Sequence, residues 1–223
     1  MSRRHFFPLA LLTAGSGLWW AHRARNWGAT AEERSATYPG DELIPEPAGV
    51  TTRAITIAAP AREVWRWLVQ IGQGRGGMYS YDALENLIGL DIHSTDEIRE
   101  EWQHLGAGDR VTLVRPGWMG LEQGYSLPVA RVDAGRAIVL RQEPPEHPWN
   151  AVWTFVVEPG SSDSCRLISH DRAARRSGMA GRFEAVGASL MEPVTTLMTR
   201  RMLLGIKDRA ERAYAASTGR STS

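Results

Sequence analysis

The chain has 223 residues, of which 43% are hydrophobic and 23% are charged, which are ordinary values for a single globular domain. Its 26 basic and 25 acidic residues give a formal net charge of +1, so no long-range field favours nucleic acid and we set that class of partner aside. The single cysteine, Cys165, excludes an intramolecular disulfide and a multi-cysteine metal site.

Residues 1–28 have the pattern of a targeting or anchoring segment. A basic start from Ser2 to His5 precedes an apolar stretch from Phe6 to Trp20, and basic residues follow it. This order predicts a membrane anchor or a cleaved signal, and the paired arginines resemble a twin-arginine export signal. A buried N-terminal helix is the third alternative. We therefore expect the protein to be membrane-associated through this segment, or exported, rather than cytoplasmic.

The rest of the chain divides by its prolines and by the period of its hydrophobic residues. Prolines within residues 29–49 predict a linker, residues 50–216 predict one domain, and the Ser/Thr/Gly-rich tail 217–223 predicts a disordered end. The elements expected in the domain are a strand over 50–58, helices over 59–71 and 82–88, strands over 110–115, 124–132, 137–142, 151–158 and 166–173, and a long helix from Phe183 onward.

This order predicts an α+β domain in which a curved antiparallel sheet wraps around the long C-terminal helix, with two short helices after the first strand. Pro128 predicts an edge or a bulge in its strand. The long helix has one apolar stripe, which would cover the concave face and leave a cavity where sheet and helix are held apart. The stripe comprises Phe183, Val186, Leu190, Val194, Leu197, Met198, Met202 and Ile206.

Several segments carry a family resemblance. They are residues 52–60, 64–72, 75–82, 84–86, 166–169 and 202–207. On these segments the chain resembles the SRPBCC superfamily of START-related and Bet v 1-like proteins, in a bacterial branch of polyketide cyclase/dehydrase and lipid-transport-like proteins. The resemblance implies the helix-grip fold over most of the chain and a small hydrophobic molecule as partner. It assigns no catalytic residue, because this fold hosts carriers, cyclases and hydrolases alike.

The glycine-rich run from Gly72 to Gly77 fits the G-x-G-x-x-G pattern of dinucleotide sites. Such a site needs a helix that begins at the glycines and a βαβ context, and the chain predicts neither. A tight or flexible connector is the favoured interpretation, and a mobile gate over the cavity mouth is an alternative.

The segment from Tyr79 to Asn86 is the densest cluster of polar and aromatic residues. Asp82, Glu85 and Asn86 share a helix face, so Asp82 or Glu85 could be a general base if burial raises its pKa. The competing interpretation is that Asp82 caps the helix and Glu85 is exposed. We predict Tyr79, Tyr81 and Asn86 as ligand-binding residues.

Further ligand-binding residues are predicted outside that segment. Trp102, Trp153 and Met191 are candidates for cavity lining, because these side chains pack well on flat or irregular ligands. His170 and Arg172 share one face of the last strand, which either lines the cavity or faces solvent. None of the six histidines has metal-site spacing, so we expect neither a metal nor a cofactor.

Three functions remain open from the sequence. The first is binding of a lipid, polyketide or isoprenoid-like molecule between the sheet and the C-terminal helix. The second is a cyclase or dehydratase that uses acid/base residues in the same cavity. The third is a membrane-associated interaction protein without a ligand.

Overall fold

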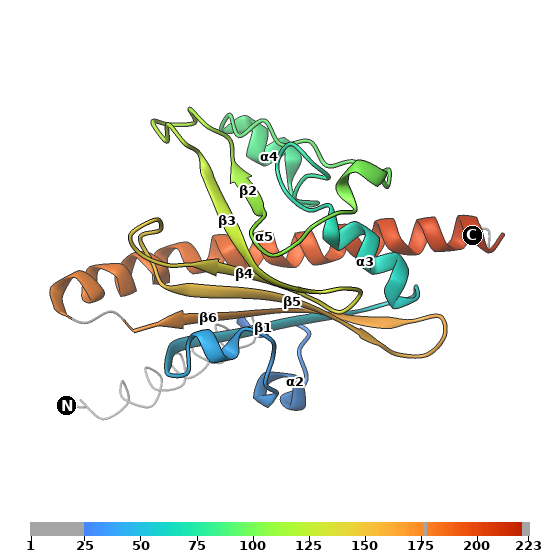
Figure 1. Ribbon diagram of the computed structural model, residues 1–223, viewed down its shortest axis with the longest axis horizontal. Coiled ribbons are helices and arrows are strands. Elements are labelled where there is room, and N and C mark those ends of the chain that lie inside the picture. The colour runs from blue at the N-terminus through green and yellow to red at the C-terminus, as the bar shows by residue number, and fades with distance from the viewer. Residues whose placement is uncertain (1–24, 176–177, 220–223) are drawn as a thin grey trace, which may run out of the picture.

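The computed structural model describes residues 25–175 and 178–219, with side chains described outside 178–191. In these residues a curved antiparallel sheet of six strands, in the order β1-β6-β5-β4-β3-β2, is crossed by one long helix, α5 (Figure 1). This is the helix-grip α+β fold that the sequence predicts. The predicted anchor or signal over residues 1–28 lies almost entirely outside the described residues, and it stays a prediction. Within the described part of the chain, no helix is both long and apolar enough to cross a membrane.

The strands and helices follow the predicted order. The strands are β1 (Pro47–Ile57), β2 (Arg110–Val114), β3 (Tyr125–Asp133), β4 (Ala137–Gln142), β5 (Ala151–Pro159) and β6 (Cys165–Ala174). The helices are α2 (Ala31–Ser35), α3 (Ala61–Val69), α4 (Asp82–Leu87) and α5 (Gly178–Ser217), with 3-10 turns η1 (Asp41–Leu43) and η2 (Glu100–Trp102). Strand β3 lies between β2 and β4, so Pro128 marks no edge; the register shift that follows it, between Val129 and Arg131, is the bulge.

Alternation along the strands gives the sheet two different faces. On β6, Leu167 belongs to the main core on the side of α5, whereas its neighbour Ile168 packs with Tyr38 and Ala54 on the other side. We call the side of α5 the concave face and the other side the convex face. A residue's parity in β1, β5 or β6 therefore decides which layer it meets.

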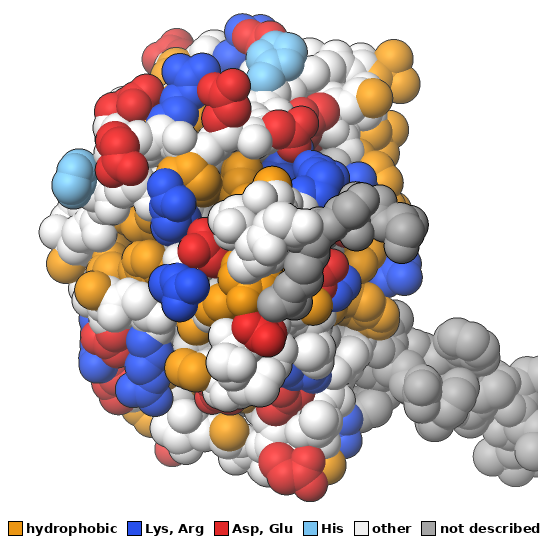
Figure 2. All heavy atoms as spheres, turned by 90° about the vertical axis from the view of Figure 1, so that its right-hand side faces the viewer, with side chains coloured by type: hydrophobic (Ala, Val, Ile, Leu, Met, Phe, Trp, Pro, Cys, Tyr) orange, Lys and Arg blue, Asp and Glu red, His pale blue; other side chains and the backbone are white. Residues whose placement is uncertain are grey.

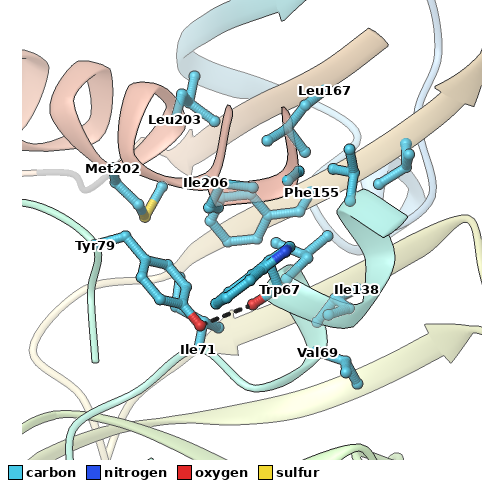
Figure 3. Packing of buried hydrophobic residues seen from close by; sticks show 14 of the residues in the cluster. Trp67, Val69, Ile71, Tyr79, Ile138, Phe155, Leu167, Met202, Leu203 and Ile206 are labelled. Carbon is cyan, nitrogen blue, oxygen red and sulfur yellow. Dashed lines mark hydrogen bonds between the residues drawn. The ribbon is translucent and has the colours of Figure 1, made fainter. Parts of the chain in front are cut away.

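The main core lies under the second half of α5 and beside α3 (Figure 3). Tyr79 is buried in it, where its hydroxyl donates to the carbonyl oxygen of Trp67 at 3.2 Å and accepts from Nε2 of Gln70 at 3.0 Å. Around this ring pack apolar side chains from α5 and from the sheet, among them Met202, Leu203, Ile206, Phe155 and Leu167. This end of the sheet–helix space is filled.

The first half of α5 packs differently from the second. Met202 and Ile206 are buried, but Val194 and Leu197 are 50% and 44% exposed. The predicted apolar stripe is therefore confirmed at the C-terminal end and wrong at Val194 and Leu197. Its members from Phe183 to Leu190 lie outside the described side chains.

Residues 29–49, predicted to be a linker, form a layer on the convex face. Arg166 on β6 pairs with Glu33 of α2 at 2.6 Å, and the Thr154 hydroxyl of β5 donates to the Pro39 carbonyl oxygen at 2.9 Å. Side-chain bonds to the sheet thus fix this segment, although its prolines leave little regular structure.

The contact between α5 and the segment at Tyr79 depends on Gly205. A methyl group added at Gly205 would overlap the backbone carbonyl of Tyr79. Helix propensity alone would make Gly205→Ala stabilising by about 0.5–1 kcal/mol. We expect destabilisation by about 1–3 kcal/mol instead, because the helix must move off the core. Urea unfolding of both proteins measures the sign, and a stabilised variant would contradict the packing described.

Candidate functional site

Beyond the main core, the concave face under the first half of α5 is polar. Its members, which we call the polar half of the concave face, are Arg53, Tyr125, Gln142, Trp153, Ser169 and Asp171. The side chain of Asp171 keeps 39% of its surface exposed, although Leu167 on the same face of β6 is fully buried. Solvent therefore reaches the sheet at this end, which lies on the left of Figure 1.

Arg53 is the most unusual member, because only 4% of it is exposed and it is charged. Its Nη1 lies 3.3 Å from Oδ2 of Asp171, and its Nη2 donates to the Thr196 hydroxyl of α5 at 3.0 Å. Among the described residues no acceptor reaches its Nε. Desolvation lowers the pKa of Arg53, while the nearby carboxylates oppose that shift. The guanidinium therefore has a donor that no described residue uses. Leaving a buried donor without a partner costs free energy of folding.

Asp171 faces the same space. Desolvation raises its pKa to about 6, and the charge of Arg53 opposes the rise. One carboxylate oxygen, Oδ2, contacts Arg53, and no described residue donates to the other, Oδ1. This carboxylate is thus partly desolvated and partly exposed, and only one of its two oxygens is hydrogen-bonded. Such a group can exchange a proton or bind a ligand.

Aromatic side chains extend this surface across the sheet. The Trp153 indole nitrogen donates to the Ser169 hydroxyl at 2.8 Å, and the ring packs against that of Phe155 with their centres 4.6 Å apart. At the far side, the Trp149 indole donates to the Tyr125 hydroxyl at 2.9 Å. Rings whose polar atoms are already bonded offer their faces to an apolar ligand.

Most of the exposed apolar residues lie on three neighbouring segments, of which α4 meets α5 at Arg201. Of the ten large hydrophobic side chains that are exposed in the described residues, seven lie on α4, on the turn between β2 and β3, or on α5. This apolar rim consists of Leu84, Leu87, Ile88, Met119, Leu121, Val194 and Leu197. The Trp118 indole bonds the Ile88 carbonyl at 2.8 Å, and the Arg201 guanidinium lies 5.9 Å from the centre of the Tyr81 ring, so the three segments adjoin. Leu197 directly follows Thr196, the partner of Arg53.

Most of the predicted polar cluster is used for structure. Both carboxylate oxygens of Asp82 accept from Ser94, at 2.6 and 2.7 Å, and the amide of Asn86 exchanges two hydrogen bonds with the backbone of Ile92. Tyr79 lies in the core. These three side chains are held by contacts within their own part of the chain, and the structure brings none of them to the polar half of the concave face.

Glu85 keeps the properties expected of an acid or base. It is buried rather than exposed, its carboxylate accepts from the Ser80 hydroxyl, and no described residue bonds its Oε2. Desolvation raises its pKa. Glu85 as a catalytic residue stays a prediction, as does Tyr81 as a ligand-binding residue.

His170 and Arg172 line neither the concave face nor solvent, which corrects both alternatives. Strand alternation places them on the convex face, where η1 covers them. Asp41 meets both: its Oδ1 lies 3.1 Å from Nε2 of His170 and its Oδ2 lies 3.0 Å from Nη1 of Arg172. Thr52 completes the contact at 2.9 Å from Nδ1 of His170. This buried group holds the N-terminal segment on the sheet.

The remaining predicted residues are dispersed. Trp102 lines a pocket of about 380 Å³ between the glycine-rich loop and residues 91–102, away from the concave face. Gly77 in that loop has φ 82° and lies against the backbone of Ser94, so the loop is a tight connector, and no helix begins at it. Trp153 lies on the concave face, and its role as a ligand-binding residue stays a prediction; Met191 lies outside the described side chains. In the described residues, no three His, Cys, Asp or Glu side chains are grouped to hold a metal ion.

The sequence analysis missed Arg53, Asp171 and Thr196. The sequence does contain a signal for Arg53. It alternates in phase with Ile55 and Ile57, which pack in the main core. An arginine in phase with core residues indicates a buried partner or a ligand. Asp171 and Thr196 carry no such signal, because only the folded chain brings them to Arg53.

Comparison with known proteins finds similarity to solved structures only. No protein-family model matches the chain, and no curated protein matches it. Solved structures that resemble it include an aromatase/cyclase from Streptomyces sp. R1128, with 19% identity, a TM-score of 0.44 and coverage of 76% of this chain and 97% of that one. A norcoclaurine synthase mutant from Thalictrum flavum has 17% identity, a TM-score of 0.41 and coverage of 76% and 96%. A protein from Thermobifida fusca has 16% identity, a TM-score of 0.45 and coverage of 73% and 93%.

These neighbours include proteins of the kind that the sequence resembles. At identities below 25% and TM-scores below 0.5, they carry no argument about ligand or chemistry.

The burial of His170 beside Asp41 on the convex face predicts that stability depends on pH. Burial lowers the pKa of His170 below its ordinary 6.5, and Asp41 only partly offsets this. The unfolded chain therefore binds the proton more readily, and stability falls as pH drops from 6.5 through the folded-state pKa. We expect urea midpoints at pH 7.5 and 5.5 to differ more for the wild type than for His170→Asn. Equal differences would contradict this, since all other titrating groups are common to both proteins.

Proposed function

We propose that the protein binds a small hydrophobic or amphipathic molecule, such as a lipid, a polyketide or an isoprenoid, between the polar half of the concave face and α5. The observation that carries this proposal is the contrast between the two ends of that space. Under the second half of α5 the core is closed, whereas under the first half Asp171 stays exposed beside a buried, incompletely bonded Arg53.

The composition of the surroundings supports an amphipathic ligand. Ring faces and exposed aliphatic side chains, at Trp153 and along the apolar rim, supply apolar area. Burying such area contributes roughly 25 cal/mol per Å² before the costs of association. Arg53 and Asp171 supply polar contacts at the sheet. The opposite end of the molecule, seen in Figure 2, shows basic, acidic and hydrophobic side chains interspersed over its surface.

A cyclase or dehydratase activity at the same surface is the second candidate, and the raised pKa of Asp171 favours it. A carboxylate with a pKa near 6 is a capable base at neutral pH. Asp171, rather than the saturated Asp82, would then hold the proton. In that case Asp171→Asn would abolish turnover of a cyclising substrate while the protein still binds it.

Substitution of the apolar rim tests the binding proposal. Leu197 and Leu43 are 44% and 41% exposed, but Leu197 directly follows Thr196, the partner of Arg53, whereas Leu43 lies on the convex face. We expect Leu197→Lys to weaken binding of a hydrophobic fluorescent probe by about tenfold, because a charge replaces apolar contact area. Leu43→Lys is the matched control and should bind the probe like the wild type.

Both leucines are exposed, so neither substitution should lower stability by more than about 0.5 kcal/mol. Equal probe affinity in the two variants would contradict the location proposed. Native mass spectrometry of the protein purified from its own host identifies a co-purifying molecule directly.

A further inference from the structure

The ion pair between Arg53 and Asp171 is neutral as a unit, but its bonding capacity is incomplete. Nη1 of Arg53 donates to Asp171 and Nη2 donates to Thr196. Its Nε–H has no acceptor among the described residues. Oδ2 of Asp171 accepts a hydrogen bond from Arg53, while Oδ1 accepts none from any described residue. Nε of Arg53 and Oδ1 of Asp171 therefore have no partner among the described residues, and each Nη group keeps one further N–H.

The neighbours of the pair limit what can complete it. Thr196 and Glu192 lie on α5 above it, and Glu192 is already paired with Arg25. Ser169, on the same face of β6, already accepts from Trp153. Apolar surface begins at Trp153 on the sheet and at Leu197 on α5. A group that completes the pair would therefore be small and polar, and would be attached to an apolar body.

The charge of the pair selects among polar groups. A carboxylate offers acceptors to Arg53 but would place its negative charge against Asp171. An ammonium group offers donors to Asp171 but would face Arg53. A hydroxyl both donates and accepts without net charge, so it can pair with Oδ1 of Asp171 and with an N–H of Arg53 together.

We propose that Arg53 and Asp171 form a subsite that selects the hydroxyl group of an otherwise apolar, uncharged ligand. The hydroxyl donates to Oδ1 of Asp171 and accepts from the guanidinium of Arg53, and the apolar body lies toward Trp153 and the apolar rim. This inference rests on the binding function proposed above, because it assigns the polar end of that same site.

Three probes with one ring system test it: 2-naphthol, 2-methylnaphthalene and 2-naphthoate, titrated calorimetrically into the full chain at pH 7.5. We expect the wild type to bind the naphthol about tenfold more tightly than the methyl compound, which is the effect of one hydrogen bond to a charged group. The naphthoate should be the weakest of the three, because its charge meets that of Asp171.

Asp171→Asn is the informative variant, because it keeps the shape of the side chain and removes its charge. We expect the preference for naphthol over naphthoate to fall by about tenfold in this variant. Asp133→Asn is the matched control, because Asp133 also pairs with an arginine, Arg131, on a strand of the same sheet. Its preference should equal that of the wild type. Each value is a ratio within one protein, so a loss of folded fraction does not change it.

The outcomes separate the two proposals. Binding of the probes without a preference for the hydroxyl, or with a preference that Asp171→Asn leaves intact, would overturn the subsite and leave the binding function standing. Failure of all three probes to bind the wild type would count against both. A preference that both asparagine variants lose equally would also overturn the subsite.

Discussion

The close approach of α5 to the backbone of Tyr79 decides how the rest of the molecule is arranged. At Gly205 the helix touches that backbone without an intervening side chain, so the second half of α5 lies directly on the core. The first half of α5 passes over the part of the sheet where polar side chains face it, and Asp171 stays partly exposed there.

The two faces of the sheet serve different purposes with similar residues. On the convex face, His170 and Arg172 lie against the buried Asp41 of the same chain, although Nε2 of His170 and Oδ1 of Asp41 have no partner with hydrogen-bond geometry. On the concave face, Arg53 and Asp171 complete each other only in part. What distinguishes the concave pair is that the Asp171 side chain stays 39% exposed, so a ligand can approach it from solvent. The difference lies in what covers each face: a fixed segment on one side and the first half of a helix on the other.

Much of the fold follows from local patterns. The alternation around Ile55 and Ile57, the turns at Gly135 and Pro144, and the long apolar helix all have short-range causes, and the observed bounds differ from those predicted by only a few residues except where α5 begins. The candidate site could not be predicted in the same way. Asp82 and Asn86 have helical spacing typical of a shared functional face, but their actual partners, Ser94 and Ile92, lie in a loop whose path no periodicity specifies.

The sequence by itself determined the order of the elements, the antiparallel sheet with a C-terminal helix, and which residues of each strand share a face. These depend on side-chain periods of 2 and 3.6 residues, which are local properties of the chain. Only the tertiary structure decided which face each layer covers, that the segment before β1 packs on the convex side, and that Arg53, Asp171 and Thr196 meet. Those contacts join residues 118 and 143 positions apart, and no local preference of the backbone encodes such a distance.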